Sequence, residues 1–223
     1  MIRLLILPPP LTYDLAMDPS INATPLDRVA LRLTWAQTRH NVRRDYDRLL
    51  ASMEKNASLP KKLFWFLLPT FLGLFLYRLS RHAYVNGWRN LGRLLYLFNT
   101  YLTRIEIPPT TSIGGGCLLG HSPITLCGHI GDNFSCMGYG GIGGGFDGQD
   151  IGAGPGLPMV GDNVVMAIRA VVLGAVHIGD GARLGPSTTV TRDVPVGSIV
   201  AAAPARITRG TGEVAAAAAG VAE

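Results

Sequence analysis

The chain has 223 residues, enough for one large domain or two modest ones, and a net charge of +5. Hydrophobic residues make up 48% of it, which can bury a core and excludes a charge-rich disordered protein. Three cysteines are too few for a disulfide scaffold, so we expect a reducing compartment.

The charge divides the chain near residue 104. Residues 26–104 carry 14 Lys or Arg and 4 Asp or Glu, whereas residues 105–223 carry 5 and 9. The amino-acid composition changes there too, from long aliphatic and aromatic residues to Gly, Ala, Ile and Val. We therefore predict an α+β protein, with a basic helical domain over 26–104 and a second domain over 105–209. Residues 1–25 are expected to be irregular or disordered, and the Ala-rich residues 210–223 to form a disordered tail.

The N-terminus makes a poor signal peptide. Its apolar stretch covers only residues 4–7, and three prolines follow it without a small-residue cleavage site. We therefore expect a cytoplasmic protein.

Two segments have the spacing of amphipathic helices. Residues 26–58 place Leu, Trp, Val and Tyr at near-helical intervals among Arg and Gln. Residues 82–103 repeat the pattern. The apolar stripe of this second segment consists of Leu91, Leu94, Leu95, Phe98 and Leu102. We predict helices in both segments, with each stripe as packing surface.

The most apolar run, residues 63–77, follows Lys61 and Lys62. A membrane-spanning helix needs about 20 apolar residues, and this run is shorter and is interrupted by Pro69 and Gly73. We expect that it does not span a membrane. Two interpretations stay open: a buried helix pair broken at Pro69, or peripheral contact of residues 61–80 with an anionic membrane surface. The second is favoured by the seven basic side chains and no acid in residues 61–104.

A repeat of six residues begins after Ile-Glu-Ile-Pro-Pro at 105–109, where two prolines end the helix. One series of repeated positions is Leu118, Ile124, Ile130, Cys136 and Ile142, and the other is Val160, Met166, Val172, Ile178, Leu184 and Val190. The two series are 18 residues apart, three whole repeats, so we expect the Gly-rich stretch between them to keep the register. One inward aliphatic side chain per six residues predicts short parallel strands, three per coil, stacked as a β-solenoid.

Residues 105–207 resemble the left-handed parallel β-helix of hexapeptide-repeat acyltransferases, and among these the serine acetyltransferase-like branch. The resemblance rests on Ile-Glu-Ile-Pro-Pro, on Ile-Gly-Gly-Gly at 113–116, on Gly120-His121, on Gly-Gly-Ile-Gly-Gly-Gly at 140–145, and on the closing Ala-Ala-Ala-Pro-Ala-Arg-Ile. It implies an acetyl-CoA-dependent O-acetyltransferase without a metal. It also implies a homotrimer or a dimer of trimers, with active sites between subunits. Members of similar length include O-acetyltransferases of surface-polysaccharide pathways.

The resemblance places a catalytic histidine at His121 and implies that an acid fifteen positions earlier, Glu106, orients it. Transfer of acetyl to a hydroxyl needs a base, and histidine suits this role because its pKa lies near neutral pH. We expect His121 to take the hydroxyl proton while Glu106 holds its tautomer and stabilises the imidazolium. Glu stands where the family usually has Asp, and the alternative role for Glu106 is an interdomain salt bridge, for example to Arg104.

The resemblance also implies a coenzyme A groove between subunits. Gly143 and Gly144 match the paired glycines at the start of the family's loop, and Ala167 matches a position that lines the pantetheine. Arg169 stands where the family usually has a small residue. The candidates for the nucleotide phosphates are Arg169, Arg192, Arg206 and Arg209, each of which could equally be a solvated surface charge.

The acceptor site departs from that of the serine-specific members. They carry an acid before the catalytic histidine and an Arg-His pair before a later proline, and the matching residues here are Gly120 and the pair Gly156-Leu157. Without those charges, nothing holds the ammonium and carboxylate of an amino acid. We therefore predict a sugar hydroxyl in polysaccharide or glycoconjugate biosynthesis as the acceptor, with L-serine as the alternative. Glu223, in place of a terminal isoleucine, argues against docking to cysteine synthase.

Two other classes stay open beside this enzyme. A catalytically silent scaffold would recruit a partner through the helical domain and use the β-helix as a trimer platform. A zinc enzyme on the same solenoid needs two histidines about five positions apart, whereas His121 and His129 are eight apart. Nucleic-acid binding is unsupported, because the excess charge lies in an apolar segment without a recognised module.

Overall fold

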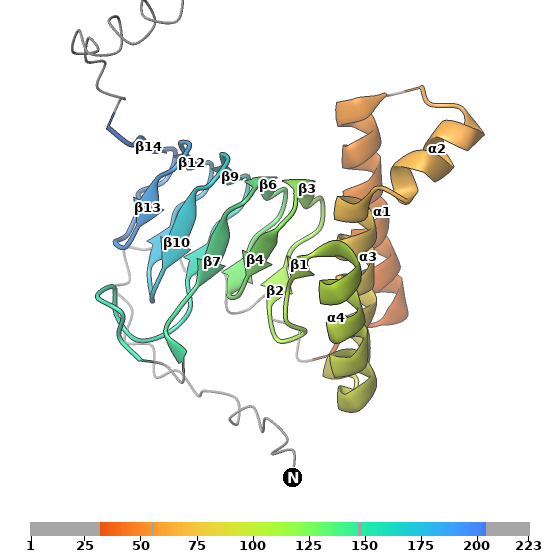
Figure 1. Cartoon of the computed structure of the whole chain (residues 1–223), viewed down its shortest axis with the longest axis horizontal. Coiled ribbons are helices and arrows are strands. Elements are labelled where there is room, and N and C mark those ends of the chain that lie inside the picture. Colours follow the sequence, from red (N-terminus) through yellow and green to blue (C-terminus); the bar gives the residue numbers. More distant parts are fainter. Residues whose placement is uncertain (1–31, 55, 147–148, 204–223) are drawn as a thin grey trace, which may run out of the picture.

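A computed structural model gives the structure of the chain and describes residues 32–54, 56–146 and 149–203. Four helices in the described part form one end of the molecule, and short strands coil away from them (Figure 1). The last helix ends at Thr103 and the first strand begins at Ile105. The predicted irregular N-terminus and the Ala-rich tail lie outside the described residues.

The helical region consists of α1 (Trp35–Met53), α2 (Leu59–Phe66), α3 (Pro69–Val85) and α4 (Arg89–Thr103). α1 lies within the predicted segment 26–58, and it begins where Thr34 and Gln37 cap each other's backbone N–H groups. The segment 82–103 is not one helix. α3 ends inside it, and α4 starts after a turn in which Gly87 has a φ of 99°, a left-handed conformation that favours glycine.

The apolar run 63–77 divides at Pro69 into α2 and α3. α3 is buried through Phe71, Leu74 and Tyr77, but α2 has no buried residue, so the expectation of a buried pair is wrong for α2. Four residues of the α4 stripe, Leu91, Leu94, Phe98 and Leu102, are exposed as well and Leu95 is half-buried, so this predicted packing surface is largely uncovered within the described chain. No single helix in the described part is long and apolar enough to cross a membrane. α2 and α3 together have the length and composition, but they are bent by 69°.

The strands pair in parallel, three to a coil, into three sheets. The first sheet holds β1 (Ile105–Glu106), β4 (Ile124–Leu126), β7 (Gly141–Gly143), β10 (Val171–Leu173) and β13 (Thr189–Val190). The second holds β2 (Ser112–Ile113), β5 (His129–Ile130), β8 (Met159–Val160) and β11 (His177–Ile178). The third holds β3 (Leu118–His121), β6 (Ser135–Gly138), β9 (Val165–Met166), β12 (Arg183–Leu184) and β14 (Ile199–Val200). This arrangement confirms the predicted parallel β-solenoid.

The inward residues follow the predicted period of six from Val160 to Val190, and all six are at most 3% exposed. In the earlier series, the inward residue of β3 is Leu119 rather than Leu118. Only five positions separate Leu119 from the next inward residue, Ile124. The repeat is therefore one residue short across the turn between β3 and β4.

The Gly-rich stretch is a loop rather than a coil. Ile142 pairs with Val172 in the first sheet, whereas Val160 pairs with Ile130 in the second. The chain between Ile142 and Val160 therefore turns one corner of the solenoid and does not complete a coil of three repeats, but both residues point inward, so the register is kept as expected. Because its length is a multiple of six, the periodicity did not reveal the insertion.

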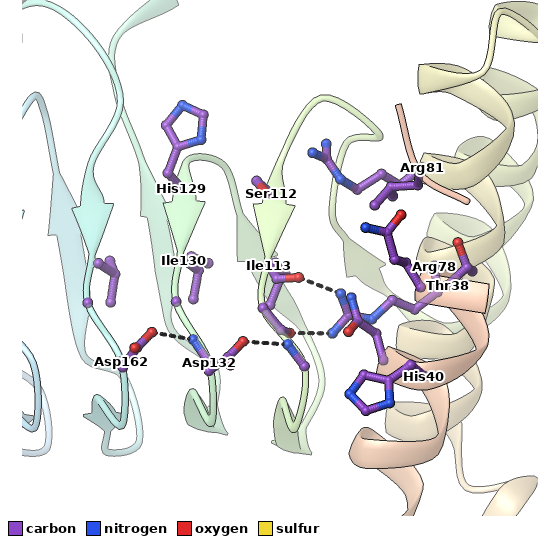
Figure 2. A pocket seen from close by; sticks show the side chains of 18 of the residues that line it. Thr38, His40, Arg78, Arg81, Ser112, Ile113, His129, Ile130, Asp132 and Asp162 are labelled. Carbon is purple, nitrogen blue, oxygen red and sulfur yellow. Dashed lines mark hydrogen bonds between the residues drawn. The ribbon is translucent and has the colours of Figure 1, made fainter. Parts of the chain in front are cut away.

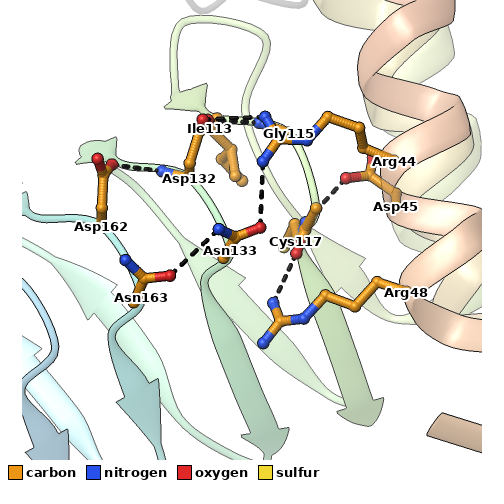
Figure 3. A network of polar contacts seen from close by, with 12 residues as sticks. Arg44, Asp45, Arg48, Ile113, Gly115, Cys117, Asp132, Asn133, Asp162 and Asn163 are labelled. Atoms are coloured by element: carbon orange, nitrogen blue, oxygen red, sulfur yellow. Dashed lines mark hydrogen bonds and ion pairs between the residues drawn. The ribbon is translucent and has the colours of Figure 1, made fainter. Parts of the chain in front are cut away.

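A buried ion pair joins the helices to the first coils. Arg78 of α3 donates to the two carboxylate oxygens of Asp45 in α1 at 2.9 and 3.1 Å, and also to the carbonyl oxygens of Ile113 and Gly114. Asp45 also accepts the backbone N–H of Cys117 at 2.8 Å (Figure 3). Buried charges persist only when they are paired and hydrogen-bonded, so this network fixes the helical end against the solenoid.

Candidate active site

His121 is the last residue of β3, and its side chain is exposed. It lies at the corner where the chain leaves the third sheet for the first, three residues before Ile124. β6 runs alongside β3 and places Gly138 next to His121. A Cβ on Gly138 would overlap the carbonyl oxygen of His121, and the φ of Gly138 is 119°, so the approach of these two strands requires glycine.

The same corner in the neighbouring coils carries further exposed side chains. The backbone N–H of Tyr139 donates to the carbonyl oxygen of Pro123, and that of Arg169 donates to the carbonyl oxygen of Gly138, both at 3.0 Å. Tyr139 and Arg169 both adopt left-handed backbone, with φ of 54° and 60°. The structure therefore brings His121 and Arg169 to the same corner of the solenoid. Their two coils are separated by one further coil, which carries Tyr139.

Glu106 lies on the first sheet, in β1, beside Thr125 of β4. Its carboxylate accepts hydrogen bonds from the Tyr96 hydroxyl of α4 at 3.1 Å and from the Thr125 hydroxyl at 3.4 Å. Within the described residues, no hydrogen bond joins Glu106 to His121, and no ion pair joins it to Arg104. The two predicted catalytic residues thus flank the same corner on strands of adjacent sheets, without a direct bond.

Burial and the negative charge of Glu106 change the pKa of two neighbouring side chains, Tyr96 and Cys127. They raise the pKa of Tyr96 to about 12 and that of Cys127 to about 11, burial being the larger cause for both. The Tyr96 hydroxyl therefore stays protonated at neutral pH and can donate to the carboxylate, and Cys127 stays a thiol rather than a nucleophilic thiolate. Among the described residues there is no group of three His, Cys, Asp or Glu side chains that could hold a metal ion.

Tyr96 and Thr125 are not among the site residues predicted from the sequence. Thr125 follows the inward Ile124, so the repeat could have placed it on the outer face beside Glu106. Tyr96 gave no comparable signal, because its contact with Glu106 depends on how α4 packs against β1.

The predicted coenzyme A residues fall into two groups. Gly143 ends β7, at the far end of the first sheet's strands from the His121 corner, and Gly144 follows it. Ala167 and Arg169 lie instead in the turn between β9 and β10, at the His121 corner. One chain therefore does not bring all four of these residues together.

The surroundings of the two glycines differ. A Cβ on Gly143 would meet no atom within 4 Å, so its backbone borders open space that a ligand can approach. A Cβ on Gly144 would overlap the carbonyl oxygen of Gly156, so Gly144 serves the packing of the loop itself. Of the two, Gly143 fits close approach of coenzyme A. The other predicted phosphate ligands are Arg192, which is exposed, and Arg206 and Arg209, which lie outside the described residues.

A cavity of about 560 Å³ lies elsewhere, between α1 and the second sheet (Figure 2). Arg81, His129 and Asp132 are among its lining residues, and none of the predicted site residues lines it. Its charged groups are engaged within the chain: Arg81 donates to carbonyl oxygens of residues 109–111, and Asp132 pairs with Arg44 at 2.9 Å. This cavity therefore belongs to the junction of helices and solenoid.

Sequence relatives of the chain are serine acetyltransferases. It is 32% identical to that of Synechococcus elongatus over 142 residues, which cover 62% of this chain and 57% of that protein. It is also 32% identical to that of Helicobacter pylori over 143 residues, 63% of this chain and 81% of that protein. The match thus spans little more than half of the Synechococcus protein but most of the Helicobacter one. No protein-family model matches the chain.

Solved structures share the fold. A Neisseria gonorrhoeae serine acetyltransferase aligns with a TM-score of 0.65 at 24% identity, over 77% of this chain and 67% of that one. A soybean serine acetyltransferase complexed with serine gives a TM-score of 0.65 at 25% identity, over 78% of this chain and 70% of that one. The sequence identity and the extent of the Helicobacter match establish the family of this chain. The chain belongs to the serine acetyltransferase family of hexapeptide-repeat β-helix acyltransferases.

Proposed function

We propose that the protein is an acetyl-CoA-dependent O-acetyltransferase in which His121 is the general base. The observation that carries this proposal is the exposed His121 imidazole at a solenoid corner of a chain that is 32% identical to serine acetyltransferases. One solved structure of this fold, with a TM-score of 0.62 and 21% identity, is a serine acetyltransferase in complex with CoA. A thioester and a hydroxyl are therefore the reactants that we expect to meet at His121.

In the proposed reaction, the acceptor hydroxyl oxygen attacks the thioester carbonyl carbon while neutral His121 accepts the hydroxyl proton. The tetrahedral intermediate then expels the CoA sulfur, which takes that proton from the imidazolium. The acetyl ester and the CoA thiol leave, and His121 returns to its starting state. Glu106 would stabilise the imidazolium and fix its tautomer. Hydroxyl donors from Tyr96 and Thr125 hold the Glu106 carboxylate beside the corner.

We propose that the working site forms between subunits of a homotrimer. In one chain, Gly143 lies at the far end of the first sheet's strands from His121 and Arg169. A groove lined by both ends would arise if a neighbouring subunit supplied one of them. Light scattering should then give a mass of about 71 kDa, three times the chain mass of 23.8 kDa.

The comparisons favour L-serine as the acceptor over the sugar hydroxyl that the sequence analysis placed first. Both sequence relatives reported above are serine acetyltransferases, and the soybean structure is a complex with serine. We therefore take L-serine as the first candidate acceptor.

One structural observation favours a sugar hydroxyl as the acceptor. A Cβ on Gly120 would lie 2.6 Å from the carbonyl oxygen of Met137, so an acidic side chain does not fit before His121 without a backbone shift. The pair Gly156-Leu157 likewise offers no charge to an amino-acid carboxylate. A sugar in polysaccharide or glycoconjugate biosynthesis is therefore the second candidate acceptor.

The test is acetyl-CoA-dependent thiol release by the purified protein, with L-serine and with a panel of free and nucleotide-linked sugars. Turnover of L-serine supports the first acceptor, and turnover of a sugar supports the second. If no acceptor is turned over and calorimetry detects no acetyl-CoA binding, the enzyme proposal fails and the scaffold alternative replaces it.

A further inference from the structure

α2 presents an apolar face that nothing in the described chain covers. Leu59, Leu63 and Leu67 follow one another at intervals of four residues along α2 and its C-terminal cap, and they are 82%, 61% and 57% exposed. Phe64, beside Leu63, is 63% exposed. A contiguous apolar face of this kind is typical of an interaction surface rather than of a surface left in water.

The other side of α2 is anchored to the helical region. The ring centroid of Phe66 lies 6.0 Å from that of Tyr46 in α1, and 5.3 Å from those of Phe71 and Phe75 in α3. The Tyr46 hydroxyl also donates to the carbonyl oxygen of Lys62. With its inner side fixed in this way, α2 lies at the outer edge of the helical region (Figure 1), and its four apolar side chains remain exposed.

The charges around this face are basic or already paired. Lys62 is exposed, and its ammonium has no partner among the described residues. Lys61 pairs with Glu54 at 2.7 Å. No Asp or Glu occurs in residues 56–105. Apolar side chains with a lysine at their edge match a surface that offers hydrocarbon beneath negative charge.

We propose that α2 docks on an anionic membrane surface, with its four exposed apolar side chains in the headgroup boundary and Lys62 against lipid phosphates. The eight-residue helix is about 12 Å long at 1.5 Å per residue. That is too short to form, alone, the roughly 800 Å² per partner of a standard protein interface. α3 is buried through Phe71, Leu74 and Tyr77, so α2 lies on the membrane and does not enter it as a span.

Sedimentation with lipid vesicles tests this proposal on the full chain. Wild type is expected to bind vesicles of phosphatidylcholine and phosphatidylglycerol, and to bind less at high salt or to phosphatidylcholine alone. The double variant Leu63→Gln/Phe64→Gln alters no buried residue and is expected to bind the anionic vesicles roughly tenfold or more weakly. Lys62→Gln is expected to weaken binding to the anionic vesicles only.

Val196→Gln/Ile199→Gln is the matched control, because these apolar residues are also exposed but lie in the last coil. It is expected to bind vesicles as wild type does, and circular dichroism verifies that both double variants are folded. The proposal is overturned if wild type binds neither kind of vesicle, or if the α2 variant binds as wild type does. It is also overturned if the α2 variant changes the oligomeric mass, which would identify a second copy of the chain as the partner.

Discussion

His121 stands where the six-residue repeat loses a residue. The chain passes from the inward Leu119 to the inward Ile124 in five positions, so β3 leads into β4 through a short turn. Strand pairing holds both ends of this turn, because β3 pairs with β6, and β4 pairs with both β1 and β7. This rigidity suits a general base, which must stay in register with the hydroxyl that it deprotonates.

Gly138 is predicted to be essential to this corner. Gly138→Ala would place a methyl group against the carbonyl oxygen of His121 at a φ of 119°, so we expect it to lower the free energy of unfolding by more than about 1 kcal/mol and to reduce thiol release. Gly143→Ala, which meets no atom within 4 Å, is the control. It should change the free energy of unfolding by less than about 0.5 kcal/mol but raise the KM for acetyl-CoA. Equal stability losses in urea unfolding of both variants would contradict this prediction.

At the scale of elements, the sequence predicted the solenoid wherever each repeat turns one aliphatic side chain inward, as from Val160 to Val190. After Ile142 it still predicted that Val160 points inward, but not that Val160 belongs to the second sheet, since an insertion whose length is a multiple of six does not shift the repeat. It predicted packing surface for the α4 stripe and left α2 either buried or at a membrane surface, because hydrophobicity shows that a side chain favours burial but not what covers it. His121 and Glu106 followed from a resemblance. The Tyr96 contact depends on packing and had no sequence signal.

The junction between α3 and the solenoid is predicted to depend on Arg78. Arg78→Ala would leave the buried carboxylate of Asp45 without its cation, so we expect the free energy of unfolding to fall by about 3–5 kcal/mol. Arg39→Ala, at an exposed position of α1, should change it by less than about 0.5 kcal/mol. Chemical denaturation measures both effects, and similar midpoints for the two variants would show that the pair does not hold the junction.

For the whole molecule, the cysteines predict a loss of stability in alkali. Burial raises the pKa of Cys136 to about 11, burial and the Glu106 charge raise that of Cys127 to about 11, and burial raises that of Cys117 as well. Thiols of the unfolded chain ionise near pH 8.5, roughly. Because the folded-state pKa values are the higher ones, the stability that these thiols contribute is present below the unfolded value and is lost as the pH rises toward the folded values.

The melting temperature should therefore fall steadily as the pH is raised from about 8.5 toward 11. In Cys136→Ala the fall should be smaller, since one of the groups that ionises on unfolding is gone. Calorimetry across this range measures both slopes. A melting temperature that does not change with pH, or equal slopes in the two proteins, would disagree with the burial of these thiols.

The position of the candidate site connects the two proposals. His121 belongs to the early coils, next to the helices, and α2 lies on that same end of the molecule (Figure 1). Docking of α2 on a membrane would turn this end of the molecule, rather than the last coils, toward the lipid. A membrane-linked sugar acceptor would then have to reach the site from this end, whereas L-serine sets no such condition.

The claim that His121 is the general base is tested most directly by acetyl-CoA-dependent thiol release in wild type, His121→Ala and His177→Ala. His177 lies on the second sheet, in β11, and serves as the control. We predict that His121→Ala loses more than about a hundredfold in kcat/KM while it still binds acetyl-CoA, and that His177→Ala keeps its activity. Turnover by His121→Ala close to that of wild type would contradict the account.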